Sequence, residues 1–346
     1  RRSNAPMRCA VDLKGFEFAL AGREVYSEQP DRIDPYASAL ISNRWSTGIG
    51  EIGALVSLSY HKTRYRDQTI YSGGYFGYNL DNSRAPYTPG VPLDPRGTSP
   101  TEPKVFRTDV IGAFDRIGTR TRPAVNATLQ WAPDDRLTIH ADGLFYGYRE
   151  RGNSNQNFTS MNGALLAPLV FVDDTKLVQS LSIANGRVAN FGGAYQNKAD
   201  RWQGALGADW TSGDWKASTE LSYTRSKATD IGNNLDIDFI ASRTDAVFND
   251  GSGAPYFTLP NDDIADPSRY YLSRLSTTRT VGDGKELAWR GDLSWRSPFL
   301  IFSGLDAGVR LSQRDAKSDS FTQTINCSAT GAVKCYSIKA ASLPGL

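Results

Sequence analysis

The chain has 346 residues and a formal net charge of +2, so it lacks the basic excess that a nucleic-acid-binding surface requires. It combines 32 Gly, 16 Tyr, 15 Phe and 7 Trp with only 2 His and 3 Cys, a composition that favours β-strands over helices. The longest apolar run, residues 163–172, is about half as long as a membrane-spanning helix, which excludes a helical membrane protein.

Alternation of apolar and polar residues predicts about nine β-strands, because successive side chains of a strand point to opposite faces. Between the fifth and sixth strands, the segment 169–183 carries Asp173 and Asp174 between two apolar runs and predicts a small hairpin. The expected strands, in chain order, are 14–26, 36–45, 51–65, 120–131, 136–149, 199–210, 215–226, 284–295 and 300–314.

The apolar side of these strands mixes Gly and Ala with large residues, whereas the other side is polar or small. Such a mixture fills a soluble core poorly but suits a surface that faces lipid. We therefore expect one outward face of a tilted antiparallel sheet to carry six leucines: Leu58, Leu129, Leu206, Leu221, Leu293 and Leu311.

Short and long connections alternate along the chain. Short turns rich in Gly, Pro, Asp and Ser are expected at 46–50, 132–135, 211–214 and 296–299. Long loops are expected at roughly 62–120, 149–198 and 226–283. Ordinary compact domains seldom contain loops of that length, whereas outer-membrane barrels combine short periplasmic turns with long extracellular loops.

Tryptophans gather beside the short turns. An indole has an apolar body and one N–H donor, so it prefers the level of the lipid headgroups. Trp202 and Trp210 share one face of one strand, eight residues apart, which spans about 20 Å of membrane depth at the tilt of barrel strands. The residues expected to form aromatic girdles are Trp45, Trp131, Trp202, Trp210, Trp215 and Trp295.

The order of segments resembles the TonB-dependent receptor family. The resemblance rests on VDLKGF at 11–16, DPYASALISN at 34–43, IGALVSLSY at 52–60, VIGAF at 110–114 and TRPAVNATLQW at 121–131. It implies an all-β, antiparallel transmembrane β-barrel, here partial, with residues 1–13 as the end of a plug and 14–346 as barrel. It also implies a location in the Gram-negative outer membrane and energy-coupled uptake of a scarce solute such as a siderophore or an oligosaccharide.

The implied partners are outer-membrane lipid, a small-molecule ligand and, in the intact receptor, a plug domain and the TonB energy-coupling protein; no nucleic acid is expected. The family's TonB box and globular plug are absent before residue 11, and its terminal aromatic strand is absent after Leu346. Plugged transporters close with about 22 strands. We therefore expect a barrel fragment in which strand 14–26 and the last strand are unpaired edges.

Aromatic residues also stud the loop 65–103, where they suit stacking on sugars or on an aromatic chelator. The candidate ligand-binding residues are Tyr71, Tyr75 and Tyr78, and the alternative is that they pack the loop against its neighbours. Cys327 and Cys335 are candidates for a loop disulfide, with metal binding or free thiols as alternatives, whereas Cys9 has no evident partner.

Other motifs are weak. The GIGEIG sequence at 48–53 matches a nucleotide fingerprint, but a strand pattern rather than a helix follows it, so a glycine-rich turn is expected. His140 and Asp142 are expected to share the lumen face as ordinary lining. The acidic pairs Asp236–Asp238 and Asp262–Asp263 are expected in solvated loops, with Ca²⁺ binding as the alternative. We expect no enzymatic activity, no cofactor and no bound metal.

Two other functions stay open. One is a passive porin or another outer-membrane barrel without energy coupling, which would need fewer long loops. The other is a soluble all-β sugar-binding module, which would not depend on detergent.

Overall fold

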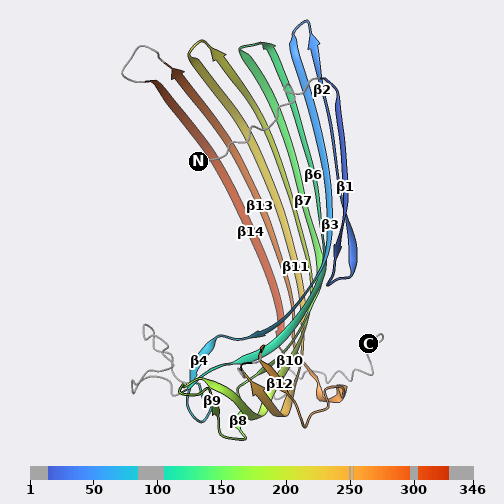
Figure 1. The fold of residues 1–346 in the computed structure, drawn as a ribbon, viewed down its shortest axis with the longest axis vertical. Coiled ribbons are helices and arrows are strands. Elements are labelled where there is room, and N and C mark those ends of the chain that lie inside the picture. Colours follow the sequence, from blue (N-terminus) through green and yellow to red (C-terminus); the bar gives the residue numbers. More distant parts are fainter. Residues whose placement is uncertain (1–14, 85–104, 249–250, 252, 297–302, 327–346) are drawn as a thin grey trace.

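The fold, a computed structural model, is described for residues 15–84, 105–248, 251, 253–296 and 303–326 (Figure 1). It is all-β, and no helix in these ranges is long and apolar enough to cross a membrane. The strands are β1 (Glu17–Ser27), β2 (Arg32–Thr47), β3 (Gly50–Ser72), β4 (Tyr75–Tyr78), β5 (Val105–Thr108), β6 (Val110–Asp134), β7 (Leu137–Ser160), β8 (Ala164–Leu165), β9 (Val170–Phe171), β10 (Val178–Ser212), β11 (Trp215–Val247), β12 (Tyr256–Thr258), β13 (Tyr271–Arg296) and β14 (Gly304–Asn326). A 3₁₀ turn, η2 (Pro267–Arg269), precedes β13.

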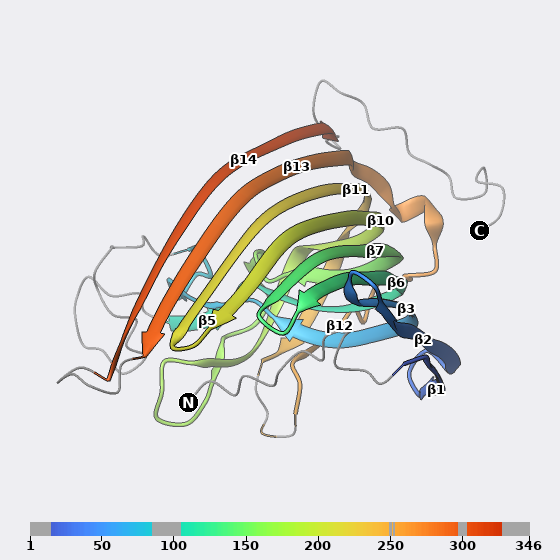
Figure 2. The same ribbon diagram turned by 90° about the horizontal axis from the view of Figure 1, so that it is seen from above.

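The long strands form one antiparallel sheet in the order β1-β2-β3-β6-β7-β10-β11-β13-β14. Short strands β8 and β9 add to β10, β12 adds to β11, and β4 pairs with β5 in a separate small sheet. The large sheet is a curved wall (Figure 2). Within the described residues β1 pairs only with β2 and β14 only with β13, so the wall is open there.

All nine predicted strands are present, and the short turns of β2–β3, β6–β7 and β10–β11 lie at one end of the wall (Figure 1). The fourth predicted turn, 296–299, lies almost entirely outside the described residues. Two residues separate the paired ends in β2–β3, β6–β7 and β10–β11. Gly50, which ends the first turn, has a φ of 113°, and an added Cβ would lie 2.3 Å from the carbonyl oxygen of Ala132. Only glycine fits both demands. The GIGEIG segment is therefore a turn followed by a strand, as expected.

The predicted long loops are wrong in extent, because much of each is strand. For example, β10 runs for 35 residues, or about 115 Å, whereas a barrel strand crosses a bilayer in about 9–11 residues. The hydrogen-bonded strand ladders continue into these polar segments because pairing between backbones does not require an apolar face. The hairpin expected at 169–183 is confirmed, since β9 pairs with the start of β10 and Asp174 adopts a φ of 57° in its turn.

A small hydrophobic core lies at the other end of the wall, where the long connections meet. Strands β4, β5, β8, β9 and β12 lie together there (Figure 1). The buried members of this loop core are Tyr78, Val105, Ile111, Met161, Val178, Leu181, Ile183, Ala246 and Phe248. The loops are therefore packed against one another and against the strand ends.

The curvature of the wall gives its two faces different character. The hydroxyl groups of Tyr65 on β3 and Tyr195 on β10 are 2.5 Å apart, although β6 and β7 lie between these strands. Three strand spacings amount to about 14 Å, so the two side chains lean toward each other across a concave surface. The face that carries Tyr65 and Tyr195 is the concave one.

Candidate functional site

Strand register places the six predicted leucines on one face. Residues directly opposite in an antiparallel pair share a face, as do residues two apart on one strand. Leu206 pairs with Leu221, Leu221 with Trp289, and Trp289 with Leu311, while Ala141 joins Leu129 to Leu206. Leu58 and Leu293 connect through Val125 and Ala217 in the same way. This confirms the expected shared face, which lies opposite Tyr65 and Tyr195.

The leucines belong to a continuous surface, here called the apolar band. It comprises alternate residues of 52–60, 123–131, 139–145, 202–210, 215–223, 287–295 and 305–311. Its large side chains are exposed; Leu206, for example, is 58% exposed. No second sheet covers the band in the described part of the chain. Monomeric soluble proteins rarely expose so extended an apolar surface.

Aromatic side chains border the apolar band on both sides. At the short-turn margin lie five indoles: Trp45, Trp131, Trp210, Trp215 and Trp295, of which the last two stack with ring centroids 5.7 Å apart. At the far margin Trp202 lies 4.3 Å from Phe145, centroid to centroid, and Tyr60 and Tyr223 lie nearby in register. About eight residues separate the margins, which corresponds to about 20 Å at the tilt of barrel strands.

Beyond the far margin the same face turns basic. On β3 the outward residues after Tyr60 are Lys62, Arg64 and Arg66. Together with six further cationic residues they form a surface here called the basic belt: Arg149, Arg151, Lys198, Arg225, Lys227 and Lys285. The acidic residues on this part of the face include Asp115, Asp200 and Asp283. This belt is not visible in the sequence, because its members come from five strands that are distant in the chain.

The concave face is polar and closely packed. Glu150 accepts hydrogen bonds from the hydroxyls of Tyr65 at 2.6 Å and Tyr148 at 2.8 Å, from Arg120 Nε at 2.9 Å and from Asn197 at 3.0 Å. Burial raises the pKa of Glu150, but these donors outweigh it and hold the pKa at about 2. Glu150 lies beyond the level of the apolar band, five residues past Phe145 on β7.

His140 and Asp142 share this concave face, as expected. His140 Nδ1 lies 3.5 Å from Asp209, and its Nε2 lies 3.8 Å from Glu220 and 4.0 Å from Asp142. Glu220 also pairs with Arg290 at 3.0 Å. No group of side chains with metal-ligand geometry occurs among the residues that the structure describes.

The three candidate tyrosines lie in different places. Tyr78 is fully buried in the loop core with the Arg107 guanidinium 3.5 Å above its ring, so it packs the loops and is not open to a ligand. Tyr71 is on the concave face of β3, where Gln156 donates a hydrogen bond to its hydroxyl, and Tyr75 is exposed on β4. Only Tyr71 and Tyr75 are placed to reach a ligand.

One of the two acidic pairs differs from expectation, whereas Asp262 and Asp263 lie in the loop between β12 and η2, as predicted. Asp236 and Asp238 lie in strand β11, not in a solvated loop, and both are buried. Each pairs with an arginine of a neighbouring strand: Asp236 with Arg274 at 2.9 Å and Asp238 with Arg187 at 2.6 Å. A buried carboxylate needs such a partner, which the local sequence does not reveal. Cys9, Cys327 and Cys335 lie outside the described residues, so the disulfide stays a prediction.

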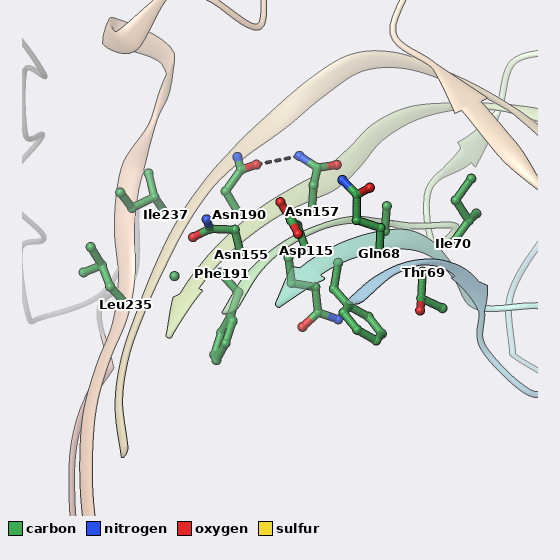
Figure 3. Close-up of a pocket in the computed structure, with 14 residues that line it drawn as sticks. Gln68, Thr69, Ile70, Asp115, Asn155, Asn157, Asn190, Phe191, Leu235 and Ile237 are labelled. Carbon is green, nitrogen blue, oxygen red and sulfur yellow. Dashed lines mark hydrogen bonds between the residues drawn. The ribbon is translucent and has the colours of Figure 1, made fainter. Parts of the chain in front are cut away.

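A pocket of about 700 Å³ opens between the strands near the loop end (Figure 3). Amide side chains of Gln68, Asn155, Asn157 and Asn190 line it, and Asn157 donates a hydrogen bond to Asn190 at 2.5 Å. Phe191 and other apolar residues complete the lining. Paired amide donors and acceptors beside apolar surface are suited to a hydroxyl-rich ligand.

Comparison of this chain with protein-family models, with curated proteins and with solved structures found no match. The features that bear on function are therefore the outward face with its apolar band and the polar concave face.

Proposed function

We propose that this chain forms part of the wall of a transmembrane β-barrel in the outer membrane of a Gram-negative bacterium. The observation that carries the proposal is the apolar band: a continuous, uncovered apolar surface about 20 Å tall with aromatic margins. In lipid the large apolar side chains of these seven neighbouring strands would be removed from water. In water they would stay hydrated, at a high cost in free energy. A soluble sugar-binding module would need a second layer over the band.

The open edges of the wall support a partial barrel, because an unpaired edge in lipid leaves backbone N–H and C=O groups without partners. We propose that further strands complete the ring. A concave, polar inner face would then line the lumen, as in outer-membrane barrels.

Within the outer-membrane class, the TonB-dependent receptor is the function favoured here. The strands continue far past the apolar band and end in a packed loop assembly, which provides a large structure for capturing a ligand outside the membrane. Tyr71, Tyr75 and the amide-lined pocket are the ligand candidates, and the solute class is a siderophore or an oligosaccharide. The plug and the TonB protein would supply the energy coupling. A passive porin is the second candidate.

Paired charge insertions test the membrane proposal. Leu206→Arg places a cation near the middle of the apolar band, where it should destabilise the bilayer-inserted form by about 2–4 kcal/mol. Gln203→Arg on the concave side of the same strand is the matched control and should cost little. The measurement is the denaturant midpoint of the whole gene product, with its barrel complete, refolded into phosphatidylcholine vesicles. Equal midpoints for both variants would contradict the proposal.

Uptake by cells tests the receptor function separately. Cells that carry the whole gene should take up a ferric siderophore or a maltodextrin probe, and a protonophore should abolish that uptake if it is energy-coupled. Uptake that persists with the protonophore would favour the porin instead.

A further inference from the structure

The basic belt contains a defined pocket. A cavity of about 620 Å³ lies between the β1–β2 turn and strands β3, β6 and β7. Four arginines line it: Arg32 beside the turn, Arg64 and Arg66 on β3, and Arg151 on β7. Asp115 is the one acidic residue in the described lining. The pocket is therefore strongly cationic.

Two of the four arginines are already neutralised. Arg64 Nε pairs with the buried Asp34 at 2.7 Å, and Arg66 pairs with Asp115 at 2.7 Å. Arg151 has no ion pair with any described carboxylate, and Arg32 donates only to the backbone oxygen of Asp31, at 2.9 Å. The two ion pairs hold the walls of the pocket, and the other two guanidinium groups leave about two positive charges for a ligand.

The position of the pocket suggests the source of that ligand. Arg64 follows Tyr60 by four residues on the outward face, so it lies about 10 Å beyond the aromatic margin of the apolar band. This is the level of lipid headgroups, and arginine side chains near a membrane boundary extend toward headgroups. The lining also includes Gln29 and Pro30 of the β1–β2 turn.

We infer that this arginine pocket binds the phosphomonoester of a membrane lipid headgroup. A phosphomonoester carries nearly two negative charges, which matches the two arginines that lack a carboxylate partner. Guanidinium groups bind phosphate oxygens in a bidentate manner, and desolvation beside the bilayer strengthens the contact. The inference rests on the proposed membrane location and adds the lipid class that the wall selects.

The test uses the whole gene product, with the strands that complete its barrel, refolded into phosphatidylcholine vesicles with and without phosphatidic acid. After mild detergent extraction, mass spectrometry counts the phosphatidic acid retained by each chain. The wild type should retain phosphatidic acid in preference to phosphatidylcholine. The double variant Arg32→Gln/Arg151→Gln should weaken this preference about tenfold or more, the size expected for loss of charged hydrogen bonds.

The matched control is Arg116→Gln/Arg122→Gln, which removes the same charge from the concave face of β6. It should retain phosphatidic acid like the wild type. A chain that inserts into both kinds of vesicle without selecting phosphatidic acid would overturn the lipid inference and leave the membrane proposal standing. Full displacement of the retained lipid by inorganic phosphate would reassign the pocket to free phosphate. A chain that inserts into neither vesicle would overturn both proposals.

Discussion

At the scale of single residues, the concave face is organised around Glu150. Its carboxylate joins β7 to β3, β6 and β10 through Tyr65, Arg120 and Asn197. The network leaves no room for larger residues beside it: a Cβ on Gly118 or Gly152 would lie 2.5 Å or 2.4 Å from the hydroxyl of Tyr65 or Tyr195. These contacts fix the positions of β3, β6, β7 and β10 relative to one another, on the loop side of the apolar band.

Glu150 should make the fold sensitive to acid. The pKa of Glu150 is lowered from 4.5 to about 2, so the charged form stabilises the folded state. That contribution is fully present above pH 4.5 and is lost as the pH falls toward 2. Glu150→Gln should lower the free energy of unfolding at neutral pH by about 3 kcal/mol and flatten its dependence on pH in this window. Denaturant titration in detergent measures both effects.

The control for Glu150 is the exposed Glu24→Gln on β1, which should leave stability and its pH dependence unchanged. An unchanged pH profile in Glu150→Gln would show that the network contributes nothing to the fold.

Tyr78 and Tyr75 at the loop end differ in burial, so their substitution should affect loop packing differently. Tyr78→Ala removes a fully buried ring from the loop core and should destabilise the loop assembly by about 3–5 kcal/mol. Tyr75→Ala removes an exposed ring and should leave the stability of the loops unchanged. Limited proteolysis of the loop end reports the difference. Equal cleavage of both variants would contradict the assignment of Tyr78 to the core.

At the scale of elements, strand prediction worked where the two faces differ in chemistry. Along 202–210 and 215–223, large apolar residues alternate with polar or small ones, so the period of two is visible in the sequence. Over 224–234 both faces of β11 are mostly polar, and the alternation disappears there although the ladder with β10 continues to Val247. The sequence therefore predicts a loop over 226–283, where the structure has strand.

The candidate sites follow the same division. The aromatic margin at the short turns was predictable because each of its five tryptophans stands beside a turn that the sequence also reveals. Trp202 at the far margin was predictable because it shares a strand face with Trp210, eight residues away. The arginine pocket was not predictable, because Arg32, Arg64 and Arg151 become neighbours only through strand register and the fold of the β1–β2 turn. The pairing of Asp238 with Arg187 likewise depends on register between β10 and β11.

The edge strands give a test at this scale. In the monomeric chain β1 and β14 are each paired on one side, whereas β7 and β10 are paired on both. Amides of β1 and β14 should therefore exchange with solvent faster than those of β7 and β10, because edge amides have fewer closed hydrogen bonds. Hydrogen exchange followed by mass spectrometry measures this order. Equal protection of all four strands in a monomer would mean that the edges are paired with each other.

At the scale of the whole molecule, the wall separates three zones along one outward face. The apolar band lies toward the short turns, the basic belt follows it, and the amide-lined pocket lies nearest the other end, where the loops pack at the strand ends (Figure 1). This order matches the sequence of environments across a membrane boundary, from hydrocarbon to charged headgroups to water. The concave face stays polar along the same length.

The most direct test of the membrane assignment is the depth of tryptophans in a bilayer. Single-tryptophan variants of the whole gene product, one retaining Trp210 and one carrying Leu206→Trp, are refolded into vesicles of lipids brominated at different acyl-chain positions. Bromines near the headgroup should quench Trp210 most, and bromines deep in the acyl chains should quench the tryptophan at position 206 most, because the band places that position near its middle. If no brominated lipid quenches either tryptophan while aqueous acrylamide quenches both, the apolar band does not face lipid and the account is wrong.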